Sequence, residues 1–201
     1  MLVFWKEKLV ILAVPKTGTT ALARALGSSA DIVINDPTEL KHAPLYRYNR
    51  FFRPMFEKAW KQEHMDVVAI MREPVSWLGS WFRYRQREFL NGKPTSTRGM
   101  DFDAFVQAYL QNDRPAFANV GSQAKFLEPR PNGTKVSHLF RYEDPAPMLG
   151  FLEHRLDRRI ELEQVNVSSK RDVNLSEETE QQLRRQHKED FDLYQSIGDA
   201  V

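Results

Sequence analysis

The chain has 201 residues, of which 41% are hydrophobic and 28% charged, with a net charge of +2 at pH 7 and no cysteine. This composition is typical of a globular domain, and the lack of cysteine excludes disulfides and thiolate metal sites. A charge balance so close to neutral argues against a nucleic-acid partner, because nucleic-acid grooves concentrate many basic residues on one face.

The N-terminal stretch MLVFWKEKLVILAV is apolar but interrupted by Lys6, Glu7 and Lys8, and we interpret it as containing the first strand. It is too short for a membrane span, and no small-residue cleavage site follows it. We therefore expect a cytoplasmic protein without a transmembrane segment, folded as one domain over residues 1–201.

Five short segments rich in aliphatic and β-branched residues predict strands. They are residues 8–14, 31–35, 66–71, 135–142 and 160–167. Continuous apolar runs such as LVILAV and VVAIM are typical of parallel strands that helices cover on both faces.

Helical patterns lie between and after these strands. They cover residues 19–26, 45–62, 74–90, 101–111, 122–127 and 146–156, and a last helix begins at Ser176. The last helix carries one stripe at helical spacing, formed by Leu183, His187, Phe191 and Tyr194. The alternation of strands and helices predicts an α/β fold, a P-loop-like three-layer sandwich with a central, mostly parallel sheet flanked by helices.

The segment AVPKTGTTAL follows the first apolar run and opens the first helix, where α/β proteins bind ligands. Gly18 lets the backbone approach an anion closely, and the amides of residues 17–20 point at that anion from the start of a helix. The hydroxyls of Thr17, Thr19 and Thr20 add neutral donors. Lys16 adds a cation on a flexible stem. The segment predicts an anion-binding loop, and an ordinary strand-to-helix turn is the alternative.

The loop differs from the nucleoside-triphosphatase pattern G-x-x-x-x-G-K-[ST], in which the lysine follows the second glycine. Here Lys16 precedes Gly18, and Arg72 follows the strand VVAIM at a point where an acidic residue would hold Mg²⁺. We therefore expect a metal-free anion transfer.

A second strand-to-helix junction reads VVAIMREPVSWLGSWFRYRQREF. Pro74 suits the first helical turn, so Ser80 lies about two turns inside the helix. The guanidinium of Arg72 and the hydroxyl of Ser80 are expected to converge on one phosphate, since arginine suits a planar contact with several donors.

The motif KTGTT at residues 16–20 resembles the 5′-phosphosulfate loop of the sulfotransferases that use 3′-phosphoadenosine-5′-phosphosulfate (PAPS). Arg72 with Ser80 resembles the 3′-phosphate site of that family, at the family's spacing. The segment HLFRYEDPAPMLGFLEHRL is similar to a strand-and-helix element common near the end of the family's core. The C-terminal tail resembles that of the carbohydrate-modifying and bacterial members. The family's C-terminal Arg-Lys-Gly motif is missing, and Lys170 or Arg171 is the candidate to replace it.

The resemblance implies a sulfuryl transfer from PAPS to an acceptor hydroxyl or amine, with Lys16 as a catalytic residue and no metal. Small-molecule acceptors from saccharide and lipid-linked sugar to peptide and phenol all fit, and the saccharide is preferred because the tail resembles carbohydrate-modifying members. A P-loop kinase or nucleotide hydrolase is an alternative that would need Mg²⁺. A catalytically silent nucleotide-binding protein is another.

In this family the base that deprotonates the acceptor is a histidine or a glutamate, often after the second strand. The segment DIVINDPTELKHAPLYRY offers Glu39 and His42 there. Imidazole titrates close to neutral pH, so His42 is preferred. Glu39 is the alternative, because burial can raise the pKa of a carboxyl into the same range.

The helix after Arg72 and the segment NVGSQAKFL contain further residues that are candidates for contact with the acceptor. An aromatic stripe is interpreted as core, with a platform for a sugar as the alternative: Trp77, Trp81 and Tyr84. A basic run is expected to face solvent: Arg83, Arg85 and Arg87. Gln123 either approaches the acceptor or belongs to an ordinary helix start at Ser122, and the helix start is preferred.

Overall fold

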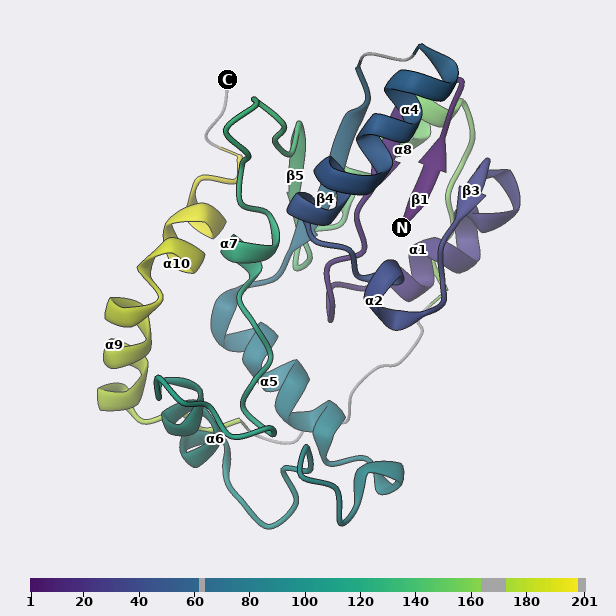
Figure 1. The fold of residues 1–201 in the computed structure, drawn as a ribbon. Coiled ribbons are helices and arrows are strands. Elements are labelled where there is room, and N and C mark those ends of the chain that lie inside the picture. The colour runs from purple at the N-terminus through teal and green to yellow at the C-terminus, as the bar shows by residue number, and fades with distance from the viewer. Residues whose placement is uncertain (62–63, 164–172, 199–201) are drawn as a thin grey trace.

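The computed structural model describes residues 1–61, 64–163 and 173–198 (Figure 1). The strands in these residues are β1 (Leu2–Phe4), β2 (Leu9–Ile11), β3 (Ile32–Val33), β4 (Asp66–Met71) and β5 (His138–Arg141). They form an open five-stranded sheet in the order β3-β1-β2-β4-β5. The pairs β2–β4 and β4–β5 are parallel, whereas β1 is antiparallel to both β2 and β3. The predicted α/β class is confirmed, and the sheet is mixed, with its parallel pairing confined to β2, β4 and β5.

The N-terminal apolar stretch forms two strands, so the expectation of a single first strand is wrong. Between the strands Lys8 takes a left-handed φ of 53°, and its N–H donates to the Trp5 carbonyl oxygen at 3.1 Å. The chain thereby reverses, and Val3 pairs with Val10 across the hairpin. The charged interruption of the apolar stretch is this turn, since turns carry polar residues in unusual backbone conformations.

The helices are α1 (Thr19–Leu26), α2 (Thr38–Lys41), α3 (Leu45–Arg47), a π-helix (Tyr48–Phe52), α4 (Arg53–Trp60), α5 (Pro74–Arg85), α6 (Phe102–Tyr109), α7 (Gln123–Phe126), α8 (Ala146–Leu156), α9 (Glu177–Gln186) and α10 (Lys188–Gln195). Short 3-10 turns follow α1 at Gly27–Ser29 and α5 at Glu88–Leu90. The bounds predicted for α1 and α8 are confirmed.

Four further predictions of regular elements need correction. The helix expected over residues 74–90 ends at Arg85, and only the short 3-10 turn at Glu88–Leu90 follows it. The helix expected over residues 45–62 is divided by the π-helix just before Pro54, which has no N–H to continue an α-helical ladder. The last helix breaks at His187, whose ψ of 35° is not helical and whose ring stacks on Tyr109. Residues 160–163 of the expected fifth strand form no strand, and the rest of it lies outside the described residues.

The two faces of the sheet bury different side chains, as the alternation along a strand requires. One face packs against α3, the π-helix and α4 through Val3, Val10, Leu12, Val67, Ala69, Leu45, Tyr48 and Phe56. The other packs against α1 and α8 through Leu2, Phe4, Leu9, Ile11, Val68, Ile70, Leu22, Leu26, Met148 and Leu152. Helices therefore cover both faces, which explains why β2 is apolar throughout and β4 is apolar after Asp66.

A third apolar cluster holds α5, α6, α9 and α10 together on one side of the molecule, away from the sheet (Figure 1). Its largest members are Trp77, Phe82, Phe102, Phe105, Tyr109 and Phe191. This cluster fixes α5 where β4 ends. None of the helices in the described residues has the length and apolar content needed to cross a lipid bilayer.

Candidate functional site

The loop between β2 and α1 has a backbone shape that most residues resist. Lys16 and Gly18 both lie in the left-handed region, with φ of 67° and 75°. Gly18 is exposed and stands at the N-cap of α1, where no side chain caps the helix. The first amides of a helix have no partner within the helix, so an uncapped N-terminus of this kind is suited to an anion.

The threonines of this loop differ in what they can offer. Thr17 is buried, and its hydroxyl donates to the Val14 carbonyl oxygen at 2.9 Å. That hydroxyl hydrogen is therefore used inside the loop, and the amide is the donor that Thr17 retains. Thr19 is also buried, whereas Thr20 is half-buried at the start of α1.

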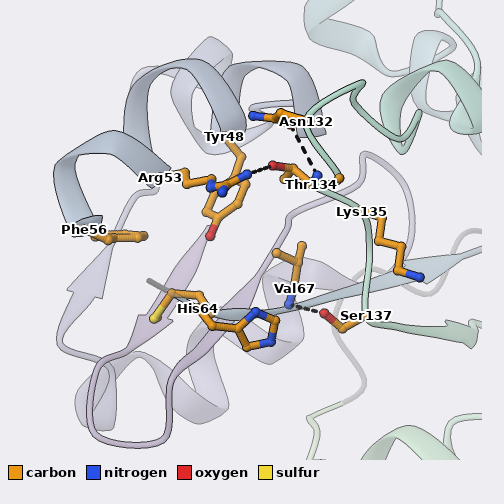
Figure 2. A pocket seen from close by; sticks show the side chains of 11 residues that line it. Tyr48, Arg53, Phe56, His64, Val67, Asn132, Thr134, Lys135 and Ser137 are labelled. Carbon is orange, nitrogen blue, oxygen red and sulfur yellow. Dashed lines mark hydrogen bonds between the residues drawn. The ribbon is translucent and has the colours of Figure 1, made fainter. Parts of the chain in front are cut away.

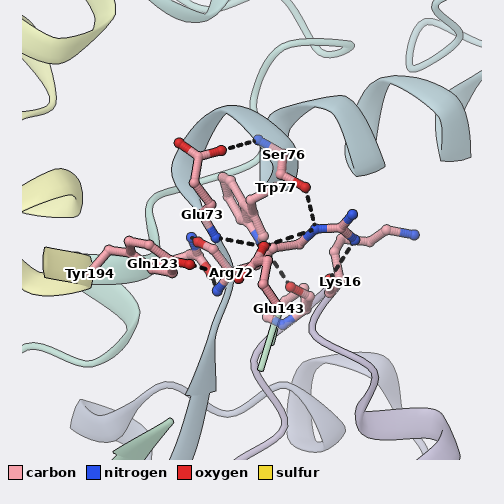
Figure 3. Close-up of polar contacts among 9 residues, drawn as sticks. Lys16, Arg72, Glu73, Ser76, Trp77, Gln123, Glu143 and Tyr194 are labelled. Carbon is pink, nitrogen blue, oxygen red and sulfur yellow. Dashed lines mark hydrogen bonds and ion pairs between the residues drawn. The ribbon is translucent and has the colours of Figure 1, made fainter. Parts of the chain in front are cut away.

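Arg72 directly follows β4, and its guanidinium reaches the loop (Figure 3). Nη1 donates to the Lys16 carbonyl oxygen at 3.5 Å, and Nε donates to Ser76 Oγ at 2.9 Å. The ring of Tyr142 lies 4.5 Å from the guanidinium carbon, and Glu143 Oε1 lies 4.0 Å from Nε. Two predicted site regions, the loop and Arg72, are thus brought together.

The backbone of Arg72 is held by a side chain from a distant part of the sequence. Gln123 accepts from the Arg72 N–H at 2.9 Å and donates to the Arg72 carbonyl oxygen at 2.7 Å (Figure 3). Its side chain is buried at 1% exposure. The predicted helix start at Ser122 is confirmed, since its hydroxyl caps the amide of Lys125. The role of Gln123 at Arg72 had no signal in the sequence.

Ser80 is buried two turns inside α5, as the sequence predicts. Among the described residues Arg72 Nε donates to Ser76 Oγ, one turn before Ser80. Ser76 and Ser80 are four positions apart and so share one face of α5. Ser76 is a site residue that the sequence analysis missed, and its spacing of four from both Arg72 and Ser80 was the available signal.

The lysine of the loop lies in a strongly cationic environment. Burial, together with the charges of Arg87, Arg72 and Arg83, lowers the pKa of Lys16 to about 8. Its Nζ lies 4.3 Å from the centre of the Tyr84 ring and 5.7 Å from that of Trp81. The lysine rests on an aromatic surface of α5, where cation–π attraction partly offsets the repulsion.

The basic run of α5 does not simply face solvent. Arg85 is buried and donates to the carbonyl oxygens of Ala116 and Asn119, at 2.7 and 3.3 Å, so the expectation for Arg85 is wrong. Burial and the nearby charge of Arg72 lower the pKa of Arg83. Within the described residues the buried Nε of Arg83 has no hydrogen-bond partner. Such a guanidinium is available to an anion.

The aromatic stripe of α5 is core only at its beginning. Trp77 is buried, and its indole N–H donates to the Pro15 carbonyl oxygen at 2.9 Å, which ties α5 to the loop. Trp81 and Tyr84 are half-buried and pack edge to face, with ring centres 5.9 Å apart. They form the surface under Lys16.

His42 lies against the start of the loop. Its Nδ1 donates to the Ala13 carbonyl oxygen at 2.6 Å, and because a carbonyl only accepts, Nε2 carries the lone pair. Burial lowers the pKa of His42, and the charges of Lys41 and Lys16 act in the same direction. The imidazole is therefore neutral at pH 7 and able to accept a proton.

Glu39 lies in the first turn of α2 with its side chain exposed. Glu39 is thus open to solvent, whereas His42 is half-buried against the loop, so His42 remains the preferred candidate for the base. Lys170 and Arg171, the candidates to replace the missing C-terminal motif, lie outside the described residues.

Comparisons of this chain with protein-family models, with curated proteins and with solved structures found no match. The function is therefore inferred from the residues of the site and their geometry.

Proposed function

We propose that the protein is a PAPS-dependent sulfotransferase built on a P-loop-like three-layer sandwich. One observation carries the proposal. The uncapped N-terminus of α1 and its lysine lie at the carboxyl end of β2, next to the carboxyl end of the parallel strand β4. There the Arg72 side chain, which follows β4, donates to the Lys16 carbonyl oxygen.

The charges of this site fit a ligand that carries more than one anionic group. Burial and the charges of nearby arginines, Arg72 and Arg83 among them, lower the pKa of Lys16. Burial and the charge of Arg72 likewise lower the pKa of Arg83, so these cations repel one another. An anion placed among them would remove this repulsion. The unpartnered Nε of Arg83 would then also gain an acceptor.

The loop and the α5 junction would hold the two ends of PAPS. The amides of residues 17–20 and the Lys16 ammonium would hold the phosphosulfate, and Arg72 with Ser80 would hold the 3′-phosphate. Ser76 keeps the Arg72 side chain in place. Lys170 remains the candidate for closing the site from the C-terminal segment.

In the proposed reaction the acceptor oxygen forms a bond to sulfur while the bond between sulfur and the phosphate oxygen breaks. The acceptor's proton goes to His42 Nε2, and 3′,5′-bisphosphoadenosine leaves. Lys16 and the loop amides stabilise the charge on the sulfuryl oxygens and on the leaving oxygen, because fixed donors act strongly on charge that develops in a site shielded from water.

The direct test is transfer of ³⁵S-labelled sulfate from PAPS to a panel of saccharides, phenols and peptides, with EDTA and then with Mg²⁺. We expect labelled product in EDTA with at least one class of acceptor. Phosphate transfer or hydrolysis from ATP that requires Mg²⁺ would support the kinase or hydrolase instead. Binding of bisphosphoadenosine with no transfer to any acceptor would support the catalytically silent protein.

The pH dependence of kcat/KM tests the assignment of the base. His42 must be neutral, and its pKa is lowered, so we expect the acidic limb of the profile below pH 6.5. Lys16 must be charged, so activity is expected to fall as the pH rises through about 8.

Two variants separate the candidate bases. His42→Ala should remove the acidic limb together with most of the rate, whereas Glu39→Gln should leave both unchanged. Full activity in His42→Ala with loss in Glu39→Gln would reverse the assignment.

A further inference from the structure

A pocket with a volume of about 170 Å³ lies at the amino ends of β4 and β5, at the opposite end of these strands from Arg72 (Figure 2). Its walls come from the π-helix and α4 on one side and from residues 132–137 on the other. The lining residues are Tyr48, Arg53, Phe56, His64, Met65, Val67, Asn132, Gly133, Thr134, Lys135 and Ser137. The site described above does not use it.

The walls of this pocket are tied together by a polar network. Asn49 Oδ1 accepts from the Thr134 hydroxyl at 2.6 Å and from Asn132 Nδ2 at 2.9 Å. Arg53 donates to Thr134 and pairs with Glu57 at 2.6 Å. The loop at residues 132–134 is thereby fixed against the π-helix, so the pocket is formed before any ligand arrives. Preformed walls reduce the entropy cost of binding.

Tyr48 provides an observation that points to a ligand. It is the first residue of the π-helix, its exposure is only 2%, and its hydroxyl is directed into the pocket (Figure 2). The buried side-chain atoms that lack a partner in the described residues do not include this hydroxyl, so its oxygen is open to the pocket although the ring is buried. A hydroxyl in this position can donate to a ligand in the pocket. π-helical turns are also frequent at functional sites.

The chemistry of the lining indicates what the hydroxyl serves. Phe56, Met65 and Val67 supply an apolar surface. The lining includes the basic side chains of Arg53 and Lys135, whereas His64 lies 3.3 Å from Asp66 Oδ1. None of the lining residues in the described part of the chain carries a carboxylate. Burial raises the pKa of Tyr48 to about 12, so its hydroxyl stays protonated and can donate.

We propose that this pocket binds a small carboxylate with a ring-sized apolar body. The body lies against Phe56, Met65 and Val67, and the carboxylate accepts from the Tyr48 hydroxyl and is attracted by Lys135. Arg53 contributes less net charge, because Glu57 neutralises it. The pocket and the proposed donor site lie at opposite ends of β4, so this inference does not depend on the sulfotransferase proposal.

Benzoate is the probe, and the methyl group of Met65 is the reporter. In protein labelled with ¹³C at the methionine methyls, benzoate should shift the Met65 signal saturably, whereas Met71 and Met148, which do not line the pocket, should stay in place. Benzamide, which lacks the charge, and acetate, which lacks the ring, should each bind more weakly. No saturable shift up to millimolar benzoate, or benzamide binding as tightly as benzoate, would overturn the proposal.

Variants test the residues assigned to the carboxylate. Tyr48→Phe keeps the ring and removes the hydroxyl, and should weaken benzoate binding about three- to tenfold, as expected for one lost hydrogen bond. Lys135→Gln should remove most of the preference for benzoate over benzamide. Lys58→Gln, an exposed lysine of α4 outside the lining, is the matched control and should change neither. Unchanged affinity in Tyr48→Phe with unchanged preference in Lys135→Gln would contradict the assignment.

Discussion

The two strand-to-helix junctions of the candidate site are built in different ways. Between β2 and α1 the shape is local, set by two left-handed residues and a short hydrogen bond within the loop. Between β4 and α5 a single arginine is held by side chains from far along the chain, including Gln123, 51 positions away. The first junction offers backbone amides of the loop at residues 16–20, which we call the cradle. The second junction offers the charged side chain of Arg72, held in a fixed direction.

The two junctions also support each other. The indole of Trp77 in α5 donates to the Pro15 carbonyl oxygen, and the Arg72 guanidinium donates to that of Lys16. A loop with two left-handed residues is strained unless its surroundings hold it, and the second junction supplies that hold. We therefore expect changes in the cradle to affect turnover most and changes around Arg72 to affect selectivity most.

The largest effect is expected for Lys16→Ala. Removing the cation should lower the single-turnover rate of sulfuryl transfer about a hundred- to a thousandfold, as for the loss of one donor to developing charge. Affinity for 3′,5′-bisphosphoadenosine should change far less. Lys8→Ala is the matched control, because Lys8 is also a lysine with positive φ but lies in the β1–β2 turn. A normal single-turnover rate in Lys16→Ala would refute the role of this residue.

Arg72→Ala should act on selectivity. We expect the preference for bisphosphoadenosine over AMP to fall about ten- to a hundredfold, since charge-assisted hydrogen bonds to one phosphate are lost. Arg155→Ala is the control, because Arg155 binds Asp66 at the other end of β4, 2.8 Å away. It should lower stability and leave the preference intact. An unchanged preference in Arg72→Ala would show that the 3′-phosphate lies elsewhere.

Gln123→Leu should have a smaller effect through the backbone of Arg72. Leucine is apolar and leaves the Arg72 N–H and carbonyl oxygen without partners, at a cost of about 1–3 kcal/mol of stability in urea unfolding. The preference for bisphosphoadenosine should fall by less than in Arg72→Ala. Gln107→Leu changes an exposed glutamine of α6, and it should change neither the stability in urea nor the preference for bisphosphoadenosine. If Gln123→Leu lowers stability but keeps the full preference, Gln123 is structural only.

The smallest effect is expected for Gly18→Ala. A Cβ at this position would lie 3.1 Å from the Tyr142 ring, which packs on the Arg72 guanidinium. The left-handed backbone adds about 1–2 kcal/mol of strain. Gly133→Ala has a similar φ of 84° with open space around it, and so measures the backbone strain alone. Only Gly18→Ala should weaken bisphosphoadenosine binding, by a few-fold. Equal effects of both variants on binding would exclude the contact with Tyr142.

What the sequence predicts well is local. The start of α1 after Gly18 follows from glycine and threonine chemistry within a few residues, and the α5 start at Pro74 follows from the missing N–H of proline. The choice of His42 over Glu39 as the base stays a prediction.

What the sequence misses depends on tertiary contacts. The buried partners of Arg85 come from residues 116 and 119, and those of the Arg72 backbone from Gln123. A basic residue in a helix has the same local pattern whether its partners are solvent or buried carbonyl oxygens. The β1–β2 hairpin is a different case, because three charged residues in an apolar run were a local signal and were interpreted as an interruption within one strand.

The central claim is that the two junctions together hold a nucleotide with phosphates at both the 3′ and 5′ positions. Calorimetric titration of the full chain with 3′,5′-bisphosphoadenosine and with AMP, both in EDTA, tests it most directly. If the two junctions hold this nucleotide, we expect tight binding of the bisphosphate without Mg²⁺ and much weaker binding of AMP. Equal affinity for the two nucleotides would contradict it.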